Sequence, residues 1–554
     1  MNIACFINKK NLHLNMQIQS EYEKINHIWI RKSIITFLSI LLILTSLESN
    51  SQTFENNKLF NKKLESANLH YNDNNFHLAL PIYNELHAMD SSNNEVCYKL
   101  GACLFKVRRQ SLESLPLFEK SKNDYSEAYY YLGQIYHRKM MFDKALESYM
   151  EFKNNGEKPD ISIEEVDYLM QKSVVAKEMI LTKSNASVTN FNNGINTPYA
   201  EYVPLLNPEE TKLFFTSRRK GSIGDLLDPY YEYFEDIYVS EKTGTTWNTP
   251  INIGAPLNTE THDACVTLSK DGQQLFTYRT SKDQITGHIF VSQNNDGKWS
   301  EPILFDAHIN SENSAESSIS IAPDQSTIYF SSNRNGGYGG KDIYRVTKMP
   351  DSTWSRPLNL GPTINTPYDE DAPFIHPDGI TLYFSSKGNK NMGGYDIFKT
   401  TKNENGQWSA AENLGFPINS VMDDIYFIAT FDGRQIYFSS NRDDGKGNMD
   451  IYKGEILDPQ TSQIILKGTV TTNEPVFMPV KAVITIIDFD TKELQGIYRT
   501  GKNGRYILVV LPRKKYKVLI ESEGYYPFST EIDMTTKLSL DDLFKSISLK
   551  KINE

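Results

Sequence analysis

The chain has 554 residues, of which 12% are aromatic, and its formal net charge is −11. That length exceeds what one hydrophobic core serves, so we expect several domains. The negative charge argues against a surface that binds nucleic acid. The four cysteines (Cys5, Cys97, Cys103 and Cys265) have neither the pattern of a disulfide framework nor the spacing of a zinc site. We expect the last three to be buried apolar side chains.

The N-terminal segment has the pattern of an export signal. Arg31 and Lys32 precede an apolar run over 34–47, and small residues then lead to Gln52. This order predicts a signal peptide over 1–51 that is cut before Gln52. The apolar run is shorter than the roughly 20 residues of a membrane span. An uncleaved inner-membrane anchor and a start at Met16 remain open alternatives, and in every case the bulk of the chain lies outside the cytoplasm.

Residues 57–182 have helical periodicity in three units of about 34 residues. The positions that recur are Ala67, Tyr71, Phe76, Ala79, Leu80 and Tyr83, then Leu100, Gly101, Leu115 and Phe118, then Leu132, Gly133, Tyr136, Phe142, Ala145 and Tyr149. Small residues are needed where two helices cross closely. A further helix over 163–181 is expected to cap the stack. The pattern resembles the tetratricopeptide (TPR) repeat, whose stacks form grooves for peptides or partner helices. Alternatively, the repeats only dock on the next domain.

A second repeat covers the middle of the chain. Trp247, Trp299, Trp354 and Trp408 are 52, 55 and 54 residues apart. Two further signals keep the same period. An aromatic pair followed by small polar residues recurs five times, as at 329–332, and a D-I-Y/F tripeptide recurs at Asp236, Asp342, Asp396 and Asp450. Such a period with several strand signals per unit predicts a β-propeller, with one four-stranded sheet for each repeat.

The two ends of this repeat region predict how the ring closes. The last repeat has no Trp segment, whereas the five residues at 195–199 recur at 364–368. We therefore expect residues 188–194 to supply the outer strand that the last sheet lacks. An open ring would leave unpaired strand edges. The prediction is a five-bladed propeller over 187–457.

Residues 464–552 alternate between apolar and polar, with turn signals between five expected strands. The segment resembles the carboxypeptidase-regulatory-like fold, a small prealbumin-type β-sandwich without catalytic residues. In that family Gly504 would form the turn before a central strand, and Gly524 with Tyr525 would end the next one.

Residues 321–344, IAPDQSTIYFSSNRNGGYGGKDIY, resemble the PD40 (WD40-like) repeat of TolB-type propellers. The order of signal, TPR repeats, PD40 propeller and sandwich resembles a group of bacterial cell-envelope proteins. PorE-type components of the type IX secretion machinery have this layout, followed by an OmpA-type peptidoglycan-binding domain. The chain stops near where that domain would begin. We therefore do not expect direct binding to peptidoglycan.

Each repeat has an acid eight residues before its Asp-Gly turn or the equivalent position: Glu201, Asp263, Glu316, Glu370 and Asp424. Five carboxylates around one channel mouth would repel each other unless each is paired or all share a cation. A basic residue also recurs after the second strand: Arg218, Arg279, Arg334, Lys387 and Arg442. One hypothesis is that every acid has its own partner and fixes the packing of its blade, and this is the hypothesis we favour. The other is a shared site for a cation or a basic peptide.

No catalytic, cofactor-binding or metal-binding residue is predicted. The chain has no G-x-S-x-G and no H-E-x-x-H. The loop at 441–450 has oxygen ligands of the calcium type but lacks the final Glu of an EF-hand. The leading hypothesis is a non-enzymatic scaffold in the periplasm or at the outer membrane. Its TPR groove and propeller face would bind envelope or secretion-machinery proteins. The alternatives are a factor associated with peptidoglycan or another glycan, and a hydrolase with its site in the propeller channel.

Overall fold

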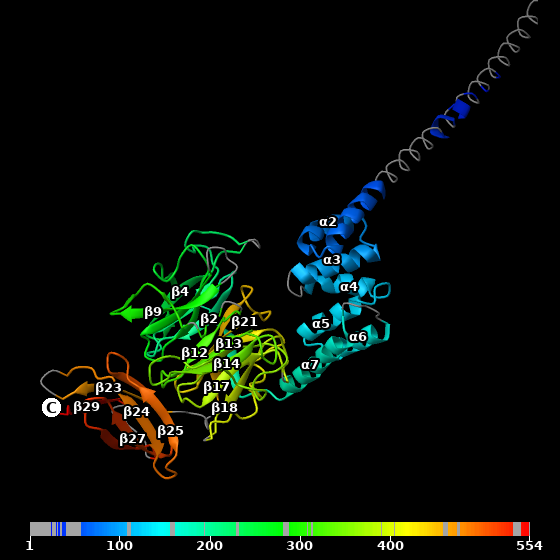
Figure 1. The fold of residues 1–554 in the computed structure, drawn as a ribbon. Helices are drawn as coiled ribbons and strands as arrows, with labels where there is room; N and C mark the ends of the chain where they lie inside the picture. The colour runs from blue at the N-terminus through cyan, green and yellow to red at the C-terminus, as the bar shows by residue number, and fades with distance from the viewer. Residues whose placement is uncertain are drawn as a thin grey trace, which may run out of the picture. The chain divides into compact units, whose positions relative to one another are not determined.

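We describe the fold from a computed structural model (Figure 1). It describes residues 57–107, 112–155, 161–192, 194–228, 232–280, 287–306, 308–311, 314–388, 390–403, 405–457, 464–473, 477–535 and 544–552, with scattered residues between 21 and 39. The expected cleavage site lies outside these residues. None of the helices in the described part is both long and apolar enough to cross a membrane. The chain divides into two compact units, Met1–Ile135 with Glu147–Ile161, and Tyr136–Leu146 with Ser162–Glu554.

The first unit consists of helices. Residues 57–72 are helical. They are followed by α2 (Phe76–Met89), α3 (Asn94–Val107), a short 3₁₀ turn (Leu112–Ser114), α4 (Leu115–Ser121), most of α5 (Ala128–Arg138) and the end of α6 (Phe142–Asn155). Small residues lie where paired helices touch. A Cβ on Gly101 would lie 3.0 Å from the Phe118 ring, and one on Gly133 would lie 2.3 Å from the Tyr149 ring. Glycine thus lets each aromatic ring reach the opposite backbone.

Each repeat of the second unit forms one antiparallel sheet. The first sheet has β2 (Glu201–Leu206), β3 (Lys212–Ser217), β4 (Asp236–Thr243), β5 (Thr246–Trp247) and β6 (Ile251–Asn252). The second has β7 (Asp263–Leu268), β8 (Gln274–Thr280), β9 (Gly287–Asn295), β10 (Lys298–Trp299) and β11 (Ile303–Leu304). The third has β12 (Ile319–Ile321), β13 (Thr327–Ser332), β14 (Asp342–Thr347) and β15 (Leu358–Asn359).

The fourth sheet has β16 (Glu370–Ile375), β17 (Thr381–Ser386), β18 (Asp396–Thr401) and β19 (Glu412–Asn413). The fifth has β20 (Asp424–Ala429), β21 (Gln435–Ser440) and β22 (Asp450–Ile456), with β1 (Ala186–Asn190) at its outer edge. The first strands touch in the order β2, β7, β12, β16, β20 and back to β2. The five sheets therefore form a closed cycle.

Strand β1 closes this cycle. It pairs antiparallel with β22, from Ala186 opposite Ile456 to Asn190 opposite Tyr452. The closing strand is therefore present, but it begins two residues before the expected 188–194 and ends four residues earlier. Phe191 and Ile195 leave the strand for the core of the first and last sheets. There the Phe191 ring lies edge-on to Trp247, with 6.1 Å between ring centroids, and 5.6 Å from the ring of Tyr437. Burial of these two side chains ends the strand.

The C-terminal segment forms two sheets around one core. Their strands are β23 (Ile464–Thr472), β24 (Val483–Asp488), β25 (Leu494–Arg499), β26 (Arg505–Val510), β27 (Lys515–Glu521), β28 (Phe528–Asp533) and β29 (Phe544–Leu549). The orders are β26-β23-β29 and β25-β24-β27-β28. Both sheets contribute to the core, for example through Val470, Ile484 and Val518. The sequence prediction missed β25 and β29. Gly504 forms the expected turn, with φ of +70°.

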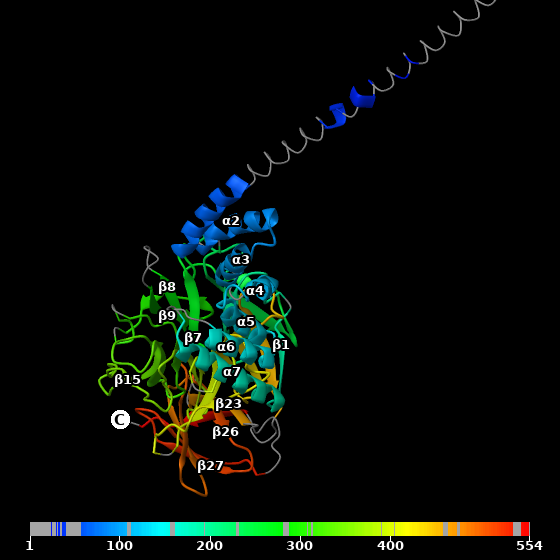
Figure 2. The ribbon, with the colours of Figure 1, turned by 90° about the vertical axis from the view of Figure 1, so that its right-hand side faces the viewer.

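Helix α7 (Ile163–Leu181, labelled in Figure 2) was expected as a cap of the helical stack. It packs against loops of the fourth sheet, where the Tyr168 hydroxyl donates to the Lys387 carbonyl and Ala176 lies in one apolar cluster with Met392. His137, near the end of α5, joins this contact. Its Nδ1 lies 2.9 Å from Ser173 Oγ on α7, and its Nε2 lies 2.9 Å from the Met392 carbonyl. Tyr168 of α7 stacks on Tyr368 with 4.8 Å between ring centroids. The contact thus combines the polar contacts of His137 with the aromatic stacking of Tyr168 on Tyr368.

We expect this contact to weaken in acid. Burial, helped by the charge of Lys172, lowers the pKa of His137 to about 4. Between that value and the unfolded value of about 6.5, the unfolded chain binds the proton first, so stability falls as pH falls. The shift corresponds to about 3 kcal/mol. The destabilisation caused by His137→Gln, measured by denaturant unfolding, should therefore shrink by that amount from pH 7.5 to pH 4. A cost that does not vary with pH would contradict this.

Candidate functional site

The five repeated acids begin, or directly precede, the first strand of each sheet. Their relative exposure is 0% for four of them and 3% for Glu316. In four of the five sheets the acid's backbone N–H donates into the preceding sheet. Glu201 donates to the Met449 carbonyl (2.7 Å), and Asp263 donates to the Glu235 carbonyl (2.8 Å). Glu370 and Asp424 donate in the same way to Lys341 and Tyr395 (both 2.7 Å). The acids therefore lie where successive sheets meet, which we call the inner rim.

The carboxylates of these acids have local partners. In four sheets a Thr or Ser four residues earlier donates both its N–H and its hydroxyl, as Thr197 does to Glu201 and Thr366 does to Glu370. Glu316 instead accepts from the Ser311 N–H and the Ser314 hydroxyl. Four of the acids also have an arginine: Glu201 with Arg219, Asp263 with Arg279, Glu316 with Arg334, and Asp424 with Arg442. These contacts are those that a packing role requires.

In two sheets the recurring basic residue is not the partner of the repeated acid. In the first sheet, Arg219 reaches the acid, whereas Arg218 pairs with Asp228 (2.5 Å) and Glu232 (2.7 Å). In the fourth sheet, Lys387 pairs with Asp369 (2.8 Å). Gly388 stands in the arginine's place there.

A Cβ on Gly388 would lie 2.1 Å from the Thr366 hydroxyl, so no larger side chain fits at this position. Glu370 is consequently the repeated acid without a cationic partner in the described structure. Burial raises its pKa to about 7, against the hydrogen bonds from Thr366 and Ser386.

Glu370 should therefore give the fold a distinct pH dependence. Between pH 4.5 and 7 the folded state keeps a proton that the unfolded chain has lost, so stability falls as pH rises. The shift corresponds to about 3 kcal/mol. The cost of Glu370→Gln in thermal unfolding should therefore decrease by up to this amount from pH 4.5 to pH 7.5. Phe384→Leu, in the same sheet and without a titrating group, is the control and should cost the same at both pH values. If the costs of both variants changed equally between the two pH values, the pH dependence would not come from Glu370.

The residue directly before each repeated Asp, or before His288 in the second sheet, has a different side chain in every sheet, and in four of the sheets its carbonyl accepts the N–H of the acid in the next sheet. The five residues are Glu235, Gly287, Lys341, Tyr395 and Met449. The repeat therefore conserves the backbone contact and varies the chemistry. Sequence reasoning concentrated on what recurs and missed these positions, although their variability within a strict repeat was visible.

Glu235 lies at the centre of one half of the rim. Its carboxylate accepts a hydrogen bond from the Tyr202 hydroxyl (2.6 Å) and lies 2.5 Å from His262 Nδ1. The imidazole of His262 stacks on Phe234 with 4.2 Å between ring centroids. The Tyr202 ring in turn stacks near Tyr426, at 6.2 Å between centroids. The first and second sheets are thus joined by polar contacts, and the first and fifth by a pair of tyrosine rings.

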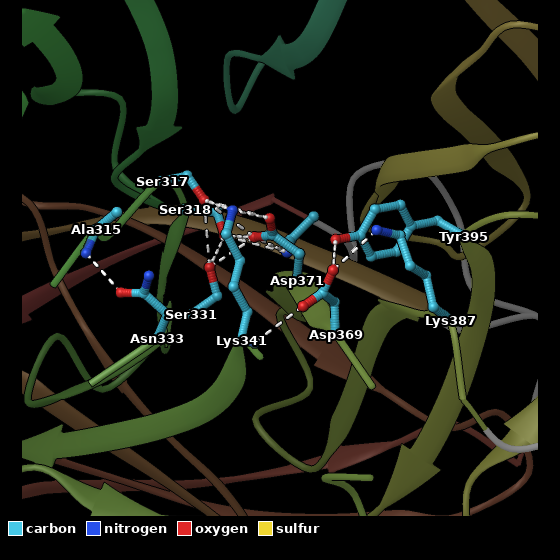
Figure 3. A network of polar contacts seen from close by, with 11 residues as sticks. Ala315, Ser317, Ser318, Ser331, Asn333, Lys341, Asp369, Asp371, Lys387 and Tyr395 are labelled. Carbon is cyan, nitrogen blue, oxygen red and sulfur yellow. Dashed lines mark hydrogen bonds and ion pairs between the residues drawn. The ribbon is translucent and has the colours of Figure 1, made fainter. Parts of the chain in front are cut away.

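Asp371 is the centre of the other half (Figure 3). Its carboxylate accepts hydrogen bonds from Lys341 Nζ (2.7 Å), from Ser318 Oγ (2.5 Å) and from Ser331 Oγ (2.6 Å). Lys341 also donates to Ser317 Oγ at 2.8 Å. These contacts link the third sheet to the fourth, and Asp371 is 3% exposed.

Tyr395 lies in the same half of the inner rim as Asp371. Its hydroxyl donates to Asp369 at 3.3 Å, and the Lys387 ammonium lies 4.6 Å from its ring centroid (Figure 3). Together with burial, the negative charges of Asp371 and Asp369 raise the pKa of the Tyr395 hydroxyl, and those of Asp371 and Glu235 raise the pKa of the Tyr426 hydroxyl. We call Tyr202, Glu235, Lys341, Asp371, Tyr395 and Tyr426, with the side chains bonded to them, the rim cluster.

The electrostatics of the rim cluster keep its acids ionised. Burial acts to raise the pKa of Glu235, but His262, Tyr202 and Arg218 outweigh it and hold the pKa below its usual value. Lys341 and two serines overcome burial in the same way at Asp371, whose pKa is also lowered. Burial raises the pKa of Tyr202, Tyr395 and Tyr426, helped by the neighbouring carboxylates. At neutral pH the cluster therefore offers carboxylates and neutral phenols.

The described residues include no group of three or more His, Cys, Asp or Glu side chains placed to hold a metal ion. In the loop at 441–450, the acidic oxygens already accept hydrogen bonds. Asp443 pairs with Arg138 (2.5 Å), Asp444 accepts from the Tyr452 hydroxyl (2.7 Å), and Asp450 accepts from the Gly447 N–H (2.9 Å). Cys97, Cys103 and Cys265 are free and buried, as expected.

Neither a family model nor a curated protein sequence matches the chain. Among solved structures, an α-L-arabinofuranosidase from Lactobacillus brevis is 12% identical, over 48% of this chain and 92% of that one, with a TM-score of 0.33. A glycosyl hydrolase from Bacteroides ovatus is 10% identical, over 48% and 90%, with a TM-score of 0.29. A prolyl endopeptidase is 13% identical, over 66% of this chain and 49% of its own, with a TM-score of 0.25.

Proposed function

We propose that the protein is a non-enzymatic scaffold of the bacterial cell envelope that binds other proteins. We infer that its helices are TPR repeats, that its five sheets are the blades of a PD40-type propeller, and that its C-terminal sheets form a prealbumin-like sandwich. The closed cycle of sheets, the β1 closure and the glycine–aromatic contacts of the helices support this assignment. Envelope or secretion-machinery proteins, such as those of type IX secretion, are the proposed partners.

The proposal rests on the partners and the pKa values of the acids in the five sheets. Every repeated acid is buried with local partners. The two acids at the centre of the rim cluster have lowered pKa values. A hydrolase that protonates a leaving group needs a carboxylic acid whose pKa is raised. The rim cluster provides ionised carboxylates instead. Glu370, whose pKa is raised to about 7, is 0% exposed and accepts hydrogen bonds from Thr366 and Ser386, so the arrangement suits binding better than acid catalysis.

Crosslinking of intact cells tests the scaffold proposal. The full-length protein, carrying an affinity tag at its C-terminus, should retain the same envelope proteins in repeated captures after crosslinking. Recovery should fall when residues 57–155 are deleted, because the helical repeats would form the binding groove. A protein recovered without any reproducible partner would contradict a scaffold function.

Export predicts a specific N-terminus. The basic, apolar and small-residue order at 31–51 should direct cleavage before Gln52. Sequencing the N-terminus of the mature protein from a membrane and periplasm fraction should therefore give Gln-Thr-Phe-Glu. A chain that begins at Met1 or Met16 would show that the segment is retained. Replacing Leu41 and Leu42 by Asp should block export and leave the protein in the cytoplasm.

A further inference from the structure

The rim cluster departs from the repeat in a way that packing does not require. Each sheet satisfies the carboxylate of its own repeated acid locally, and in four of the five sheets a backbone carbonyl accepts the acid's N–H. The side chains of Glu235 and Asp371 take no part in that pattern. They nevertheless bring carboxylates and several tyrosines together from different sheets.

The rim cluster carries an excess of negative charge. Its ion pairs and those directly beside them contain five carboxylates and three fixed cations, namely Glu235, Asp371, Asp369, Asp228 and Glu232 against Arg218, Lys341 and Lys387. His262 is the remaining titratable partner. A ligand of positive charge would complement this balance, whereas an anion would meet the ionised acids.

Aromatic rings and unused hydroxyls face the same region. Tyr426 is half-buried, its ring lies beside that of Tyr202, and the charges of both Glu235 and Asp371 act on it. Tyr278 is also half-buried, and the charge of Glu235 acts to raise its pKa while that of Lys341 acts to lower it. Among the described residues, neither of these two phenol hydroxyls has a hydrogen-bond partner. A cation gains both from the faces of such rings and from carboxylates nearby.

Two fully buried hydroxyls beneath the rim are also without partners in the described structure, those of Thr277 and Ser385. The equivalent Thr216 and Ser439 accept hydrogen bonds from the backbone of the next sheet's first strand, at Cys265 and Val203. Thr277 and Ser385 occupy the same strand position without that bond. Buried polar groups left unpaired are costly. These two hydroxyls are therefore available to form further hydrogen bonds below the rim.

We propose that the rim cluster binds a cationic side chain, the guanidinium of arginine or the ammonium of lysine, presented by a partner protein. The inference rests on the proposed function as a scaffold and names the chemistry that one face would recognise. Glu235 would supply the charge, and Tyr202 and Tyr426 would supply the aromatic surface. The five symmetric acids, which the sequence suggested for a basic peptide, are not part of this site.

The test uses the full-length protein and N-acetyl-argininamide, with N-acetyl-citrullinamide as its neutral isostere, in calorimetric titrations at pH 7.5. The arginine compound should bind saturably, with a Kd of about 1 mM, and the citrulline compound should not bind. Glu235→Gln should weaken binding at least fivefold. Tyr426→Phe removes a hydroxyl without a partner, so this variant should fold normally and bind two- to threefold more weakly. Glu412→Gln, which removes the same charge on the exposed strand β19, should bind as the wild type does.

Equal binding of the two compounds, or equal affinity in Glu235→Gln, Tyr426→Phe and the wild type, would overturn the proposal. Calcium chloride titrated alone gives the competing result: if Ca²⁺ binds with the same dependence on Glu235 and the arginine compound does not, the site is one for an inorganic cation. Captures from crosslinked cells separate this inference from the scaffold function. If Glu235→Gln retains every partner, the scaffold stands and the cation site falls.

Discussion

Replacing β1 (Ala186–Asn190) by a Gly-Ser linker of equal length should destabilise the five sheets by about 3–5 kcal/mol. The change removes a five-residue ladder with β22 and the contacts of Ala186 and Val188 with the core of the last sheet. It also leaves the edge of β22 unpaired. Because β1 precedes β22 by more than 250 residues, its loss opens the cycle of sheets rather than shortening one hairpin.

Tryptophan fluorescence during urea unfolding measures this effect, since four of the five tryptophans lie in the repeats. The control replaces β11 (Ile303–Leu304) by Gly-Ser. That strand also lies at the outer edge of a sheet, with both side chains exposed, but it pairs with β9 of the same repeat and joins no distant parts of the chain. The control should cost less than about 1 kcal/mol. If the β1 variant unfolded at the same urea concentration as the wild type, β1 would not close the cycle.

Arg442→Met should cost about 3–5 kcal/mol, because it leaves the fully buried carboxylate of Asp424 without its cation. Arg442 also donates to the carbonyls of Pro417 (3.1 Å) and Ile418 (2.8 Å), so the change leaves backbone acceptors unpaired as well. The second substitution Asp424→Asn should recover part of the loss, because it removes the unpaired charge. The coupling between the two positions, taken from a double-mutant cycle, should exceed about 1.5 kcal/mol.

Lys177→Met is the matched control for a pair at the surface. Its partner Asp143 is 82% exposed, and exposed pairs contribute at most about 1 kcal/mol. If Arg442→Met cost no more than Lys177→Met, the acids of the inner rim would not depend on their arginines. The shared site that the sequence left open for the five acids would then regain support.

The repeats of the chain could be recognised without the structure because they depend on local patterns. A strand such as β13 is encoded by Tyr329 and Phe330 followed by two serines, and a turn such as that at Gly504 needs a residue that tolerates positive φ. The glycines at helix crossings and the closing strand near 188 follow from the same kind of reasoning. The strand β29 was missed because it pairs in parallel with the distant β23, which no local pattern reveals. The strand β25, which pairs with its neighbour β24, was missed because Gly496 inside it weakens the strand signal.

The sequence by itself thus determined the order and period of the elements, since each repeat encodes its own strands and turns. The tertiary structure decided which charges meet. Arg219 rather than Arg218 reaches Glu201, and Gly388 leaves Glu370 without an arginine, because these contacts depend on which side of a strand end a side chain leaves. The rim cluster is the clearest case. Glu235 and Asp371 lie more than 130 residues apart, and only the closed cycle of sheets brings both to act on Tyr426.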